Sequence, residues 1–129
     1  MSVVRMQRLR LNNFAELALL DRLTTPIWVF NVTKQSMWWA NARALAFWGA
    51  DSMEDLIARD FSADSATARA RQRQIVSTSN GNQKIEETWT LFPLGKPQTV
   101  FASIQPVVLE DKDDGILVEL HRILETDQD

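Results

Sequence analysis

Cysteine is absent from the 129 residues of this chain. Without thiols the protein forms no disulfides and no thiolate metal sites, and it has no cysteine nucleophile. A flavin or another chromophore that attaches through sulfur is excluded for the same reason. The absence of this one residue type therefore removes many enzymatic and photochemical functions from consideration.

Long apolar runs are missing as well. No segment approaches the roughly 18 to 20 residues of a membrane-spanning helix. The opening sequence MSVVRMQRLRLNN is basic but lacks a following apolar stretch, so we expect no signal peptide and a cytoplasmic location. A strongly basic composition is also missing: the net charge is −3 and the isoelectric point is about 5.1, which argues against nucleic acid as a partner.

What is present predicts one globular domain. Hydrophobic residues make up 45% of the chain and charged residues 24%, proportions that are typical of a protein with a single core. The four glycines and four prolines fall mostly at the ends of patterned segments. They therefore mark turns and helix ends along the chain.

The first half of the chain predicts a helix, a hairpin and a second helix. In NNFAELALLDRL, Asn13 and Glu16 have capping-box spacing before an apolar face, and Pro26 follows the helix. The β-branched and aromatic segments PIWVFNV and MWWA, joined by TKQS, predict two strands with a tight turn. Asn41 then stands at the start of the helical segment ARALAFW, so we expect it to cap a helix that ends at Gly49.

The second half predicts two more helices and three strands. Ser52 and Asp55 have cap spacing for a short helix in DSMEDLIARD, and ADSATARARQRQIVSTSNG favours a longer one. QKIEETWTLFP, PQTVFASIQPVVLE and GILVELHRI predict strands separated by the loops LGK and DKDDG. Together these elements predict an α+β fold, a five-stranded antiparallel sheet with helices packed on one face and an N-terminal helix before it. The other sheet face is left for partners.

This order of elements resembles the PAS domain, the sensory-box module of bacterial signalling proteins. WWANARALAFWG resembles the family's strand that ends in alanine and asparagine and opens a helix, and the later elements match in order and length. The resemblance covers residues 13–123, leaving 1–12 as an N-terminal extension and 124–129 as the start of a linker. The end of the last strand departs from the family, because HRILET stands where many members have Asp-Ile-Thr. A cone-shaped α+β fold of the cystatin type is the alternative.

Tryptophans gather around the predicted strand-to-helix corner. Alternation puts Trp28 and Phe30 on one face of their strand, and the resemblance makes this face the interior one. A flat aromatic or heterocyclic ligand would stack on such indoles, and each buried indole N–H needs a partner. The candidates for the lining of such a ligand pocket are Trp28, Phe30, Asn41, Leu45, Trp48, Trp89, Val100, Ala102, Ile104, Val118 and Leu120. A core that these side chains fill without a ligand is the other interpretation, and the sequence favours it. Whether Trp38 or Trp39 faces inward stays open, because a slip of one residue exchanges the two faces.

Cofactors can be compared with the family residue by residue. Haem-binding members take the iron with a histidine on the long helix, and residues 65–80 contain none. The single histidine, His121, falls on the last strand, where a surface position is favoured over an axial ligand. Haem and covalent flavin are therefore disfavoured, noncovalent flavin stays open, and the cofactor is unknown. The loop DKDDG lacks the ligand spacing of a calcium loop, so no metal is expected.

Catalytic groups form no recognisable set. Glu86 and Glu87 are neighbours on a predicted strand and point to opposite faces, so they do not make an acid and base pair. The arginines of residues 69–73 predict a solvated helix surface, with contact to an anion or an acidic partner as the alternative. We expect no enzymatic activity in this domain.

The resemblance implies a sensory domain that dimerises and regulates an attached output domain. Exposed side chains of the open sheet face and the flanking helix are the candidates for a homodimer contact: Phe14, Leu17, Ile27, Val29, Trp38, Phe101 and Val107. A diguanylate cyclase of the GGDEF type is the preferred output domain, and a histidine kinase is the second choice. Two other functions stay open, a ligand-free structural dimerisation module and a small enzyme on a cone-like fold.

Overall fold

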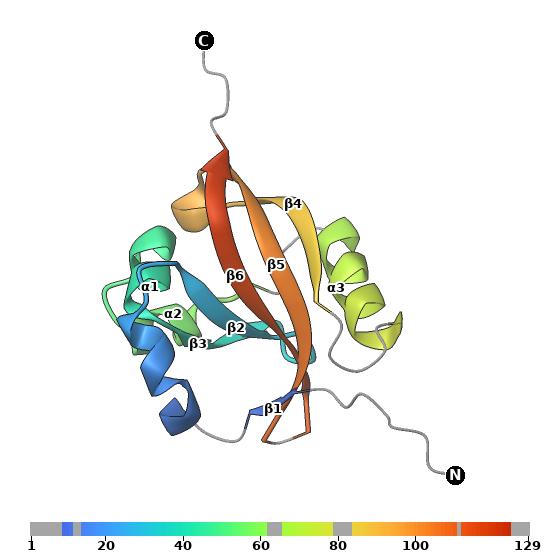
Figure 1. The fold of residues 1–129 in the computed structure, drawn as a ribbon. Helices are drawn as coiled ribbons and strands as arrows, with labels where there is room; N and C mark the ends of the chain where they lie inside the picture. Colours follow the sequence, from blue (N-terminus) through green and yellow to red (C-terminus); the bar gives the residue numbers. More distant parts are fainter. Residues whose placement is uncertain (1–8, 12–13, 62–65, 79–83, 111, 125–129) are drawn as a thin grey trace.

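The computed structural model describes residues 9–11, 14–61, 66–78, 84–110 and 112–124. The strands of this part of the chain are β1 (Leu9–Leu11), β2 (Ile27–Asn31), β3 (Ser36–Ala40), β4 (Ile85–Leu91), β5 (Gln98–Leu109) and β6 (Asp114–Leu124). Its helices are the 3-10 helices η1 (Phe14–Arg22) and η2 (Pro93–Gly95) and the α-helices α1 (Ala42–Trp48), α2 (Met53–Ala58) and α3 (Ala66–Thr78). The predicted order of helices and strands is confirmed (Figure 1).

All the strands belong to one sheet with the order β1-β5-β6-β2-β3, and β4 also pairs with β5. Strands β2 to β6 pair antiparallel, as the sequence predicts. β1 is an addition, since it runs parallel to β5 opposite Val107 to Leu109, beyond the part of β5 that pairs with β4. A strand of three residues is too short to show alternation, so the sequence pattern does not reveal it. The sheet thus extends into the segment 1–12.

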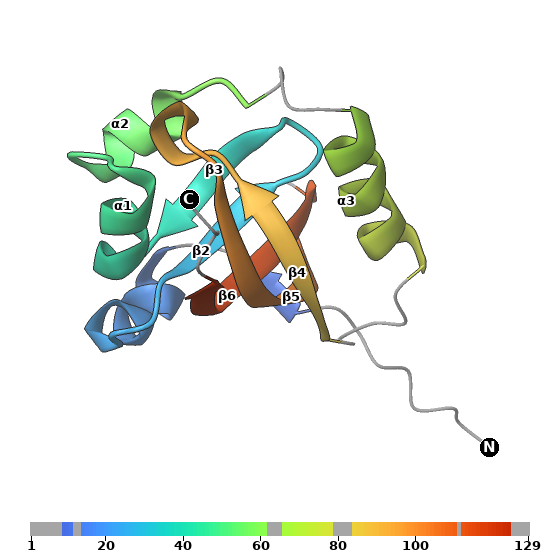
Figure 2. The ribbon, with the colours of Figure 1, turned by 90° about the horizontal axis from the view of Figure 1, so that it is seen from above.

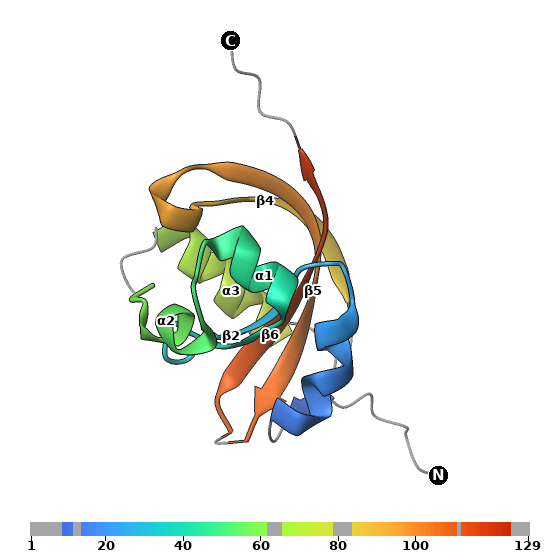
Figure 3. The same ribbon diagram turned by 90° about the vertical axis from the view of Figure 1, so that its left-hand side faces the viewer.

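The sheet curls around α1, α2 and α3 (Figure 3). Figure 2 shows α1 and α2 next to each other and α3 apart from them. Buried helix residues, among them Ala44, Leu56 and Ile75, pack against the concave face of the sheet. The strand residues of this core include Trp28, Phe30, Val100, Ala102, Ile104, Ile116, Val118 and Leu120, and Val32 of the β2–β3 turn belongs to it as well. The inward face predicted for Trp28 and Phe30 is confirmed.

A second apolar cluster lies on the outer face of the sheet. Its buried members are Leu11, Leu17, Ile27, Val29, Trp39, Val107 and Leu109. β1 and η1 supply the first two, so the N-terminal segment covers this part of the sheet. The prediction that this face is open is therefore wrong for Leu17, Ile27, Val29 and Val107, which are at most 4% exposed.

A β-bulge positions the tryptophans of β3. The pairing between β2 and β3 shifts between Val29 opposite Trp39 and Phe30 opposite Met37, so Trp38 is an extra residue on β3. Trp39 is buried in the outer cluster, and half-buried Trp38 packs against the same cluster. Both indoles consequently lie on the outer side of the sheet, which settles the point that the sequence left open.

Asn41 joins three elements at the strand-to-helix corner. Its Oδ1 accepts hydrogen bonds from the backbone N–H of Ala44 at 2.9 Å, which caps α1 as predicted, and from that of Ile27 at 3.1 Å. Its Nδ2 donates to the carbonyl oxygens of Leu20 at 3.0 Å and Thr25 at 2.9 Å, near the end of η1. The side chain is completely buried, and so are its bonds to the N–H groups of Ile27 and Ala44, so these two donors depend on Asn41 and not on water.

The other helix ends agree with the sequence where they are described. Ser52 Oγ accepts a hydrogen bond from the backbone N–H of Asp55 at 3.0 Å and caps α2. The predicted cap at Asn13 lies outside the described residues, and so do the side chains of Glu16 and of Phe14, a candidate for the dimer contact. In the described part of the chain, no helix has the length and apolar character that a membrane span requires.

Gly49 ends α1 in the left-handed region, with φ at 64°. We expect Gly49→Ala to lower the free energy of unfolding by about 1–2 kcal/mol, because a side chain is disfavoured at this φ. An added Cβ would also lie 2.4 Å from Cδ1 of Leu94. Urea denaturation measures the loss. Gly95→Ala is the matched control, because Gly95 has φ at 82° but open space around it, and it should lose less. A Gly49→Ala protein as stable as the wild type would contradict this account.

Candidate functional site

A cavity of about 520 Å³ lies between α3 and β4. β4 and the residue after it contribute the continuous run 87–92. α3 contributes residues one helical turn apart, with Thr67 and Ala68 followed by Arg71 and Gln72. Trp48 and Phe61 complete the lining. The volume falls in the range of sites that hold small organic ligands, roughly 300–1,000 Å³.

Of the predicted pocket residues, Trp48 and Trp89 line this cavity. Leu45 packs against the core from outside it, and Asn41 occupies the corner described above. The remaining ones are buried members of the core: Trp28, Phe30, Val100, Ala102, Ile104, Val118 and Leu120. Side chains from the strands and α1 thus fill the middle of the concave face, and the open space lies nearer to α3.

Several lining residues were not predicted from the sequence. Phe61 and Phe92 lie outside the helices and strands, where periodicity gives no information. Arg71 and Gln72 lie on α3, and their spacing of four residues from Thr67 and Ala68 is the signal that marks one helix face. That signal does not say which face of α3 meets β4.

Aromatic rings form the inner wall of the cavity. Trp48 makes edge-to-face contacts with the rings of Trp28, Phe47 and Phe61 at centroid distances of 5.5, 5.4 and 5.6 Å. Trp28 in turn stacks on Phe47 at 5.7 Å with the two rings almost parallel. These contacts fix the orientation of the Trp48 indole, which is 5% exposed.

An ion pair links α3 to β4 beside the cavity. Arg71 Nε donates to Glu87 Oε1 at 3.1 Å, and Arg71 Nη2 forms a second, shorter contact with Glu87 Oε2. Trp89 Nε1 also donates to Glu87 Oε1, at 2.7 Å. Gln74 Oε1 accepts from Arg71 Nη1 at 2.8 Å. The charges of Arg71 and Glu87 are therefore compensated within the protein.

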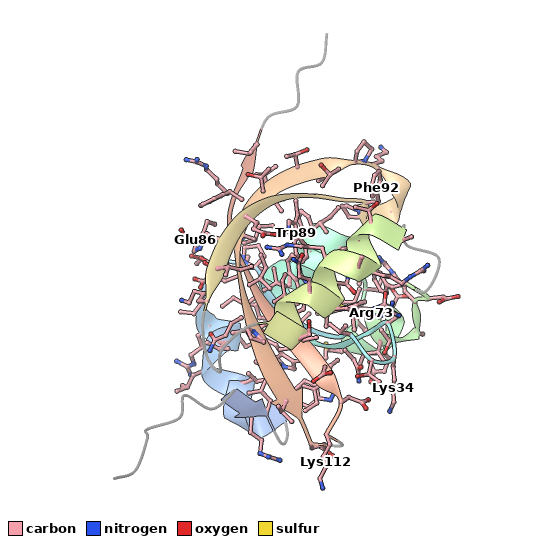
Figure 4. The ribbon with its side chains drawn as sticks, turned by 90° about the vertical axis from the view of Figure 1, so that its right-hand side faces the viewer. Lys34, Arg73, Glu86, Trp89, Phe92 and Lys112 are labelled. Atoms are coloured by element: carbon pink, nitrogen blue, oxygen red, sulfur yellow. The ribbon has the colours of Figure 1, made fainter. Side chains whose placement is uncertain are left out.

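Figure 4 views the molecule from the side of α3. Trp89 lies close to this helix, whereas Glu86 points outward from β4, away from it. The predicted opposite orientation of Glu86 and Glu87 is confirmed, since Glu87 lines the cavity and Glu86 is exposed. Phe92 lies beside the N-terminal end of α3 and is 60% exposed.

A buried amide pair holds the inner side of α3. Gln35 Nε2 donates to Gln72 Oε1 at 2.8 Å and to the carbonyl oxygen of Val32 at 2.9 Å. Gln35 lies in the turn between β2 and β3 with φ at 56°, and Gln72 lines the cavity. The pair therefore connects the cavity wall to the β2–β3 turn.

His121 lies on the outer face of the sheet, as predicted. It contacts Ser103 Oγ through Nε2, and its ring centroid is 5.9 Å from that of Phe101. Glu86 Oε2 is 3.7 Å from the same nitrogen. His121 does not line the cavity, so it has no part in the site between α3 and β4.

We expect Glu87→Gln to lower the free energy of unfolding by about 0.5–1 kcal/mol, because the ion pair with Arg71 is only partly buried. The amide oxygen of glutamine can still accept from Trp89. Denaturation at low and high salt measures the effect, and the loss should shrink with added salt. Glu86→Gln is the matched control on the outer face and should change stability by less than about 0.5 kcal/mol. A larger loss for Glu86→Gln than for Glu87→Gln would contradict the assignment.

No protein-family model matches the sequence, and no curated protein matches it either. Among solved structures, the chain is similar to the PAS domain of nitrogen regulation protein NR(II) from Vibrio parahaemolyticus. The TM-score is 0.58 and the identity 16%, over 81% of this chain and 94% of that one. A domain of a sensory box sensor histidine kinase/response regulator from Geobacter sulfurreducens gives a TM-score of 0.52 and 17% identity, over 84% of this chain and 91% of that one.

The LOV protein of Rhodobacter sphaeroides is also similar, with a TM-score of 0.56 and 17% identity over 80% of this chain, which spans 61% of that protein. At these identities the likeness concerns the fold. In this chain β2 and β3 precede α1, α2 and α3, and β4 to β6 follow them. The resemblance predicted from the sequence is thereby confirmed at the level of architecture: this chain has the PAS fold.

Proposed function

We propose that this domain is a sensor of a signalling protein and that it binds a small ligand in the cavity between α3 and β4. The cavity of about 520 Å³ with its aromatic wall is the observation that carries the proposal. Side chains fill the core on the concave face, and the cavity is a separate space beside that core. The domain itself is proposed to have no catalytic activity and to act on an attached output domain.

The mechanism that we propose is a shift between two positions of α3. This helix is held to β4 by Arg71 and Glu87 and to the β2–β3 turn by Gln72 and Gln35. A ligand between α3 and β4 touches both attachments. It changes the output only to the extent that it binds more tightly to one position of the helix than to the other.

Native mass spectrometry of the protein as purified from its own cells tests the proposed function. We expect a bound small molecule in addition to the mass of the chain. The variant Thr67→Trp places a large side chain on the exposed side of the cavity, and we expect it to lose the bound molecule while it keeps the wild-type stability. A protein free of ligand, with wild type and variant indistinguishable, would support the alternative of a ligand-free structural module with a filled core.

Dimerisation through the outer face is a further part of the proposal. Phe101 is half-buried on the outer face and does not belong to the apolar cluster that η1 covers. The guanidinium of Arg122 lies 5.6 Å from the centroid of its ring. Trp38 is the second candidate. We expect a homodimer in analytical ultracentrifugation that Phe101→Glu dissociates. Leu19→Glu on exposed η1 should leave the dimer intact. A wild-type monomer at micromolar concentration would refute the dimer.

For the output domain we propose a diguanylate cyclase of the GGDEF type first and a histidine kinase second. The similar Geobacter domain comes from a protein described as a histidine kinase, which supports the second choice. An antibody against this domain should detect a protein larger than 14.7 kDa in the source cells. Assays for cyclic diguanylate synthesis and for autophosphorylation of that larger protein distinguish the two. A protein of 14.7 kDa in those cells would contradict both.

A further inference from the structure

β4 has one unpaired edge. In the part of the chain that the structure describes, β4 pairs with β5 on one side and with no strand on the other. Figures 1 and 2 show α3 on the side of β4 that faces away from β5. The cavity between α3 and β4 therefore borders the unpaired edge, where a strand presents backbone N–H and C=O groups.

The register of the sheet determines which residues of β4 direct these groups at the cavity. Leu109 N donates to Asp113 O at 3.0 Å, at the end of the pairing between β5 and β6. Successive residues of an antiparallel strand bond alternately to the strands on its two sides. Counting back from Leu109 in steps of two, Ser103 therefore bonds to β6. Its neighbours Ala102 and Ile104 bond to β4.

Thr88 and Thr90 direct their backbone groups at the unpaired edge. Glu87 lies opposite Ala102, so it bonds to β5, and the next residue, Thr88, faces the other way. The pairing continues without a bulge, so the same holds for Thr90. Both threonines line the cavity. Thr90 Oγ1 lies 3.1 Å from Thr99 Oγ1 on the outer face of the sheet, so Thr90 contributes its main chain to the cavity wall.

The charged and amide side chains of the lining already have partners. Arg71 and Glu87 form an ion pair, and Gln72 Oε1 accepts from Gln35. A ligand that bonds to one of these groups has to break an existing interaction. The edge of β4 requires no such exchange within the described residues, because no strand bonds to it.

The edge also has a definite chemical pattern. The N–H and the C=O of one residue point to the same side of a strand, where a paired strand would meet them with a C=O and an N–H. A small molecule reproduces this contact when it carries a donor next to an acceptor. The rings of Trp48, Phe61 and Trp89, which line the cavity, favour a flat apolar body for that molecule.

We infer that the cavity selects flat heterocycles with an N–H donor next to a C=O acceptor, and that this amide edge pairs with the main chain of Thr90. The inference rests on the proposed function, because it names the chemical class of the ligand at the same site. The ligand takes the place of the strand that β4 lacks on this side. The aromatic rings supply affinity, and the edge of β4 distinguishes between ligands of the same shape.

Three bicyclic probes of similar shape test the inference. 2-Quinolinone carries the N–H and the C=O side by side, coumarin has a ring oxygen in place of the N–H, and naphthalene has neither group. Their dissociation constants come from NMR titrations of the ¹⁵N-labelled protein. We expect 2-quinolinone to bind about tenfold more tightly than coumarin, because coumarin offers no donor to the carbonyl oxygen of Thr90.

The variant Thr90→Pro removes the N–H at the unpaired edge. It leaves the bonds to β5 intact, because proline is tolerated where an edge strand directs its N–H away from the sheet. Its affinity for 2-quinolinone should fall about tenfold, and its affinity for naphthalene should stay within about twofold of the wild type. Thr90→Val is the matched control, since it loses the same hydroxyl group but keeps the N–H. It should bind both probes like the wild type.

The wild-type protein gives an independent readout if Thr90→Pro fails to fold. In protein labelled with ¹⁵N-threonine, the resonance that disappears in Thr90→Val is the backbone amide of Thr90. 2-Quinolinone should shift this resonance downfield as its carbonyl oxygen accepts from the amide, and naphthalene should not.

The outcomes separate the inference from the proposed function. If 2-quinolinone and coumarin bind equally well between α3 and β4, or if 2-quinolinone leaves the Thr90 amide unshifted, the inference is overturned and the proposed ligand site stands. Undiminished binding of 2-quinolinone to folded Thr90→Pro overturns the inference in the same way. If none of the three probes binds between α3 and β4, the inference and the proposed ligand site fail together.

Discussion

Replacing Asn41 by alanine is expected to lower the free energy of unfolding by about 3–5 kcal/mol. The side chain is fully buried and makes hydrogen bonds to the backbone of Ile27, Ala44, Leu20 and Thr25. Alanine removes the acceptor of the buried N–H groups of Ile27 and Ala44, and each buried group left unpaired costs about 1–3 kcal/mol before the structure relaxes. It also removes the donor to the Thr25 carbonyl oxygen, whereas the Leu20 carbonyl oxygen keeps the N–H of Leu23. Urea denaturation monitored by tryptophan fluorescence measures the loss.

Ser52→Ala is the control for Asn41→Ala. Ser52 also caps a helix, but its hydrogen bond to Asp55 N is exposed to solvent. Loss of such a cap costs about 1 kcal/mol. Equal losses for the two variants would mean that Asn41 acts as an ordinary helix cap and not as the junction of η1, β2 and α1.

Replacing Trp28 by alanine is expected to cost about 3–5 kcal/mol as well, the range for deletion of a large aromatic side chain from a core. Trp28 is 3% exposed, stacks on Phe47 and contacts Trp48 edge-on. Its removal leaves a cavity on the concave face that the neighbouring β6 residue Val118 cannot fill. Chemical denaturation measures the change in the free energy of unfolding.

Leu19→Ala is the control for Trp28→Ala, because Leu19 is 78% exposed on η1. It should change the free energy of unfolding by less than about 0.5 kcal/mol. A loss of this small size for Trp28→Ala would place Trp28 outside the core and would undermine the description of the concave face as filled.

The sequence predicts the architecture well because its signals are local and repeated. Alternation of Trp28, Phe30 and Val32 indicates the inner face of β2, and the position of Asn41 after MWWA indicates a cap. The hydrogen bonds from Asn41 to Leu20 and Thr25 cannot be predicted in the same way, since they join residues that are 21 and 16 positions apart in the chain. Their existence depends on how η1 crosses the sheet.

Tertiary packing also explains what the sequence predicts incorrectly. Alternation correctly puts Val29 and Val107 on the outer face of the sheet. Residues of η1 and β1 cover them there, and alternation along a strand does not indicate what packs on a sheet face. The bulge at Trp38 interrupts the period of two, so neither assignment of Trp38 and Trp39 follows from counting. The position of the cavity depends on the distance between α3 and β4, which no single helix or strand encodes.

The crystal structure of the protein purified from its own cells, without added ligand, tests the central claim most directly. The account predicts electron density for a flat molecule between α3 and β4, in contact with the rings of Trp48 and Trp89. A cavity that holds only ordered water would contradict the proposed function and would favour a ligand-free structural module.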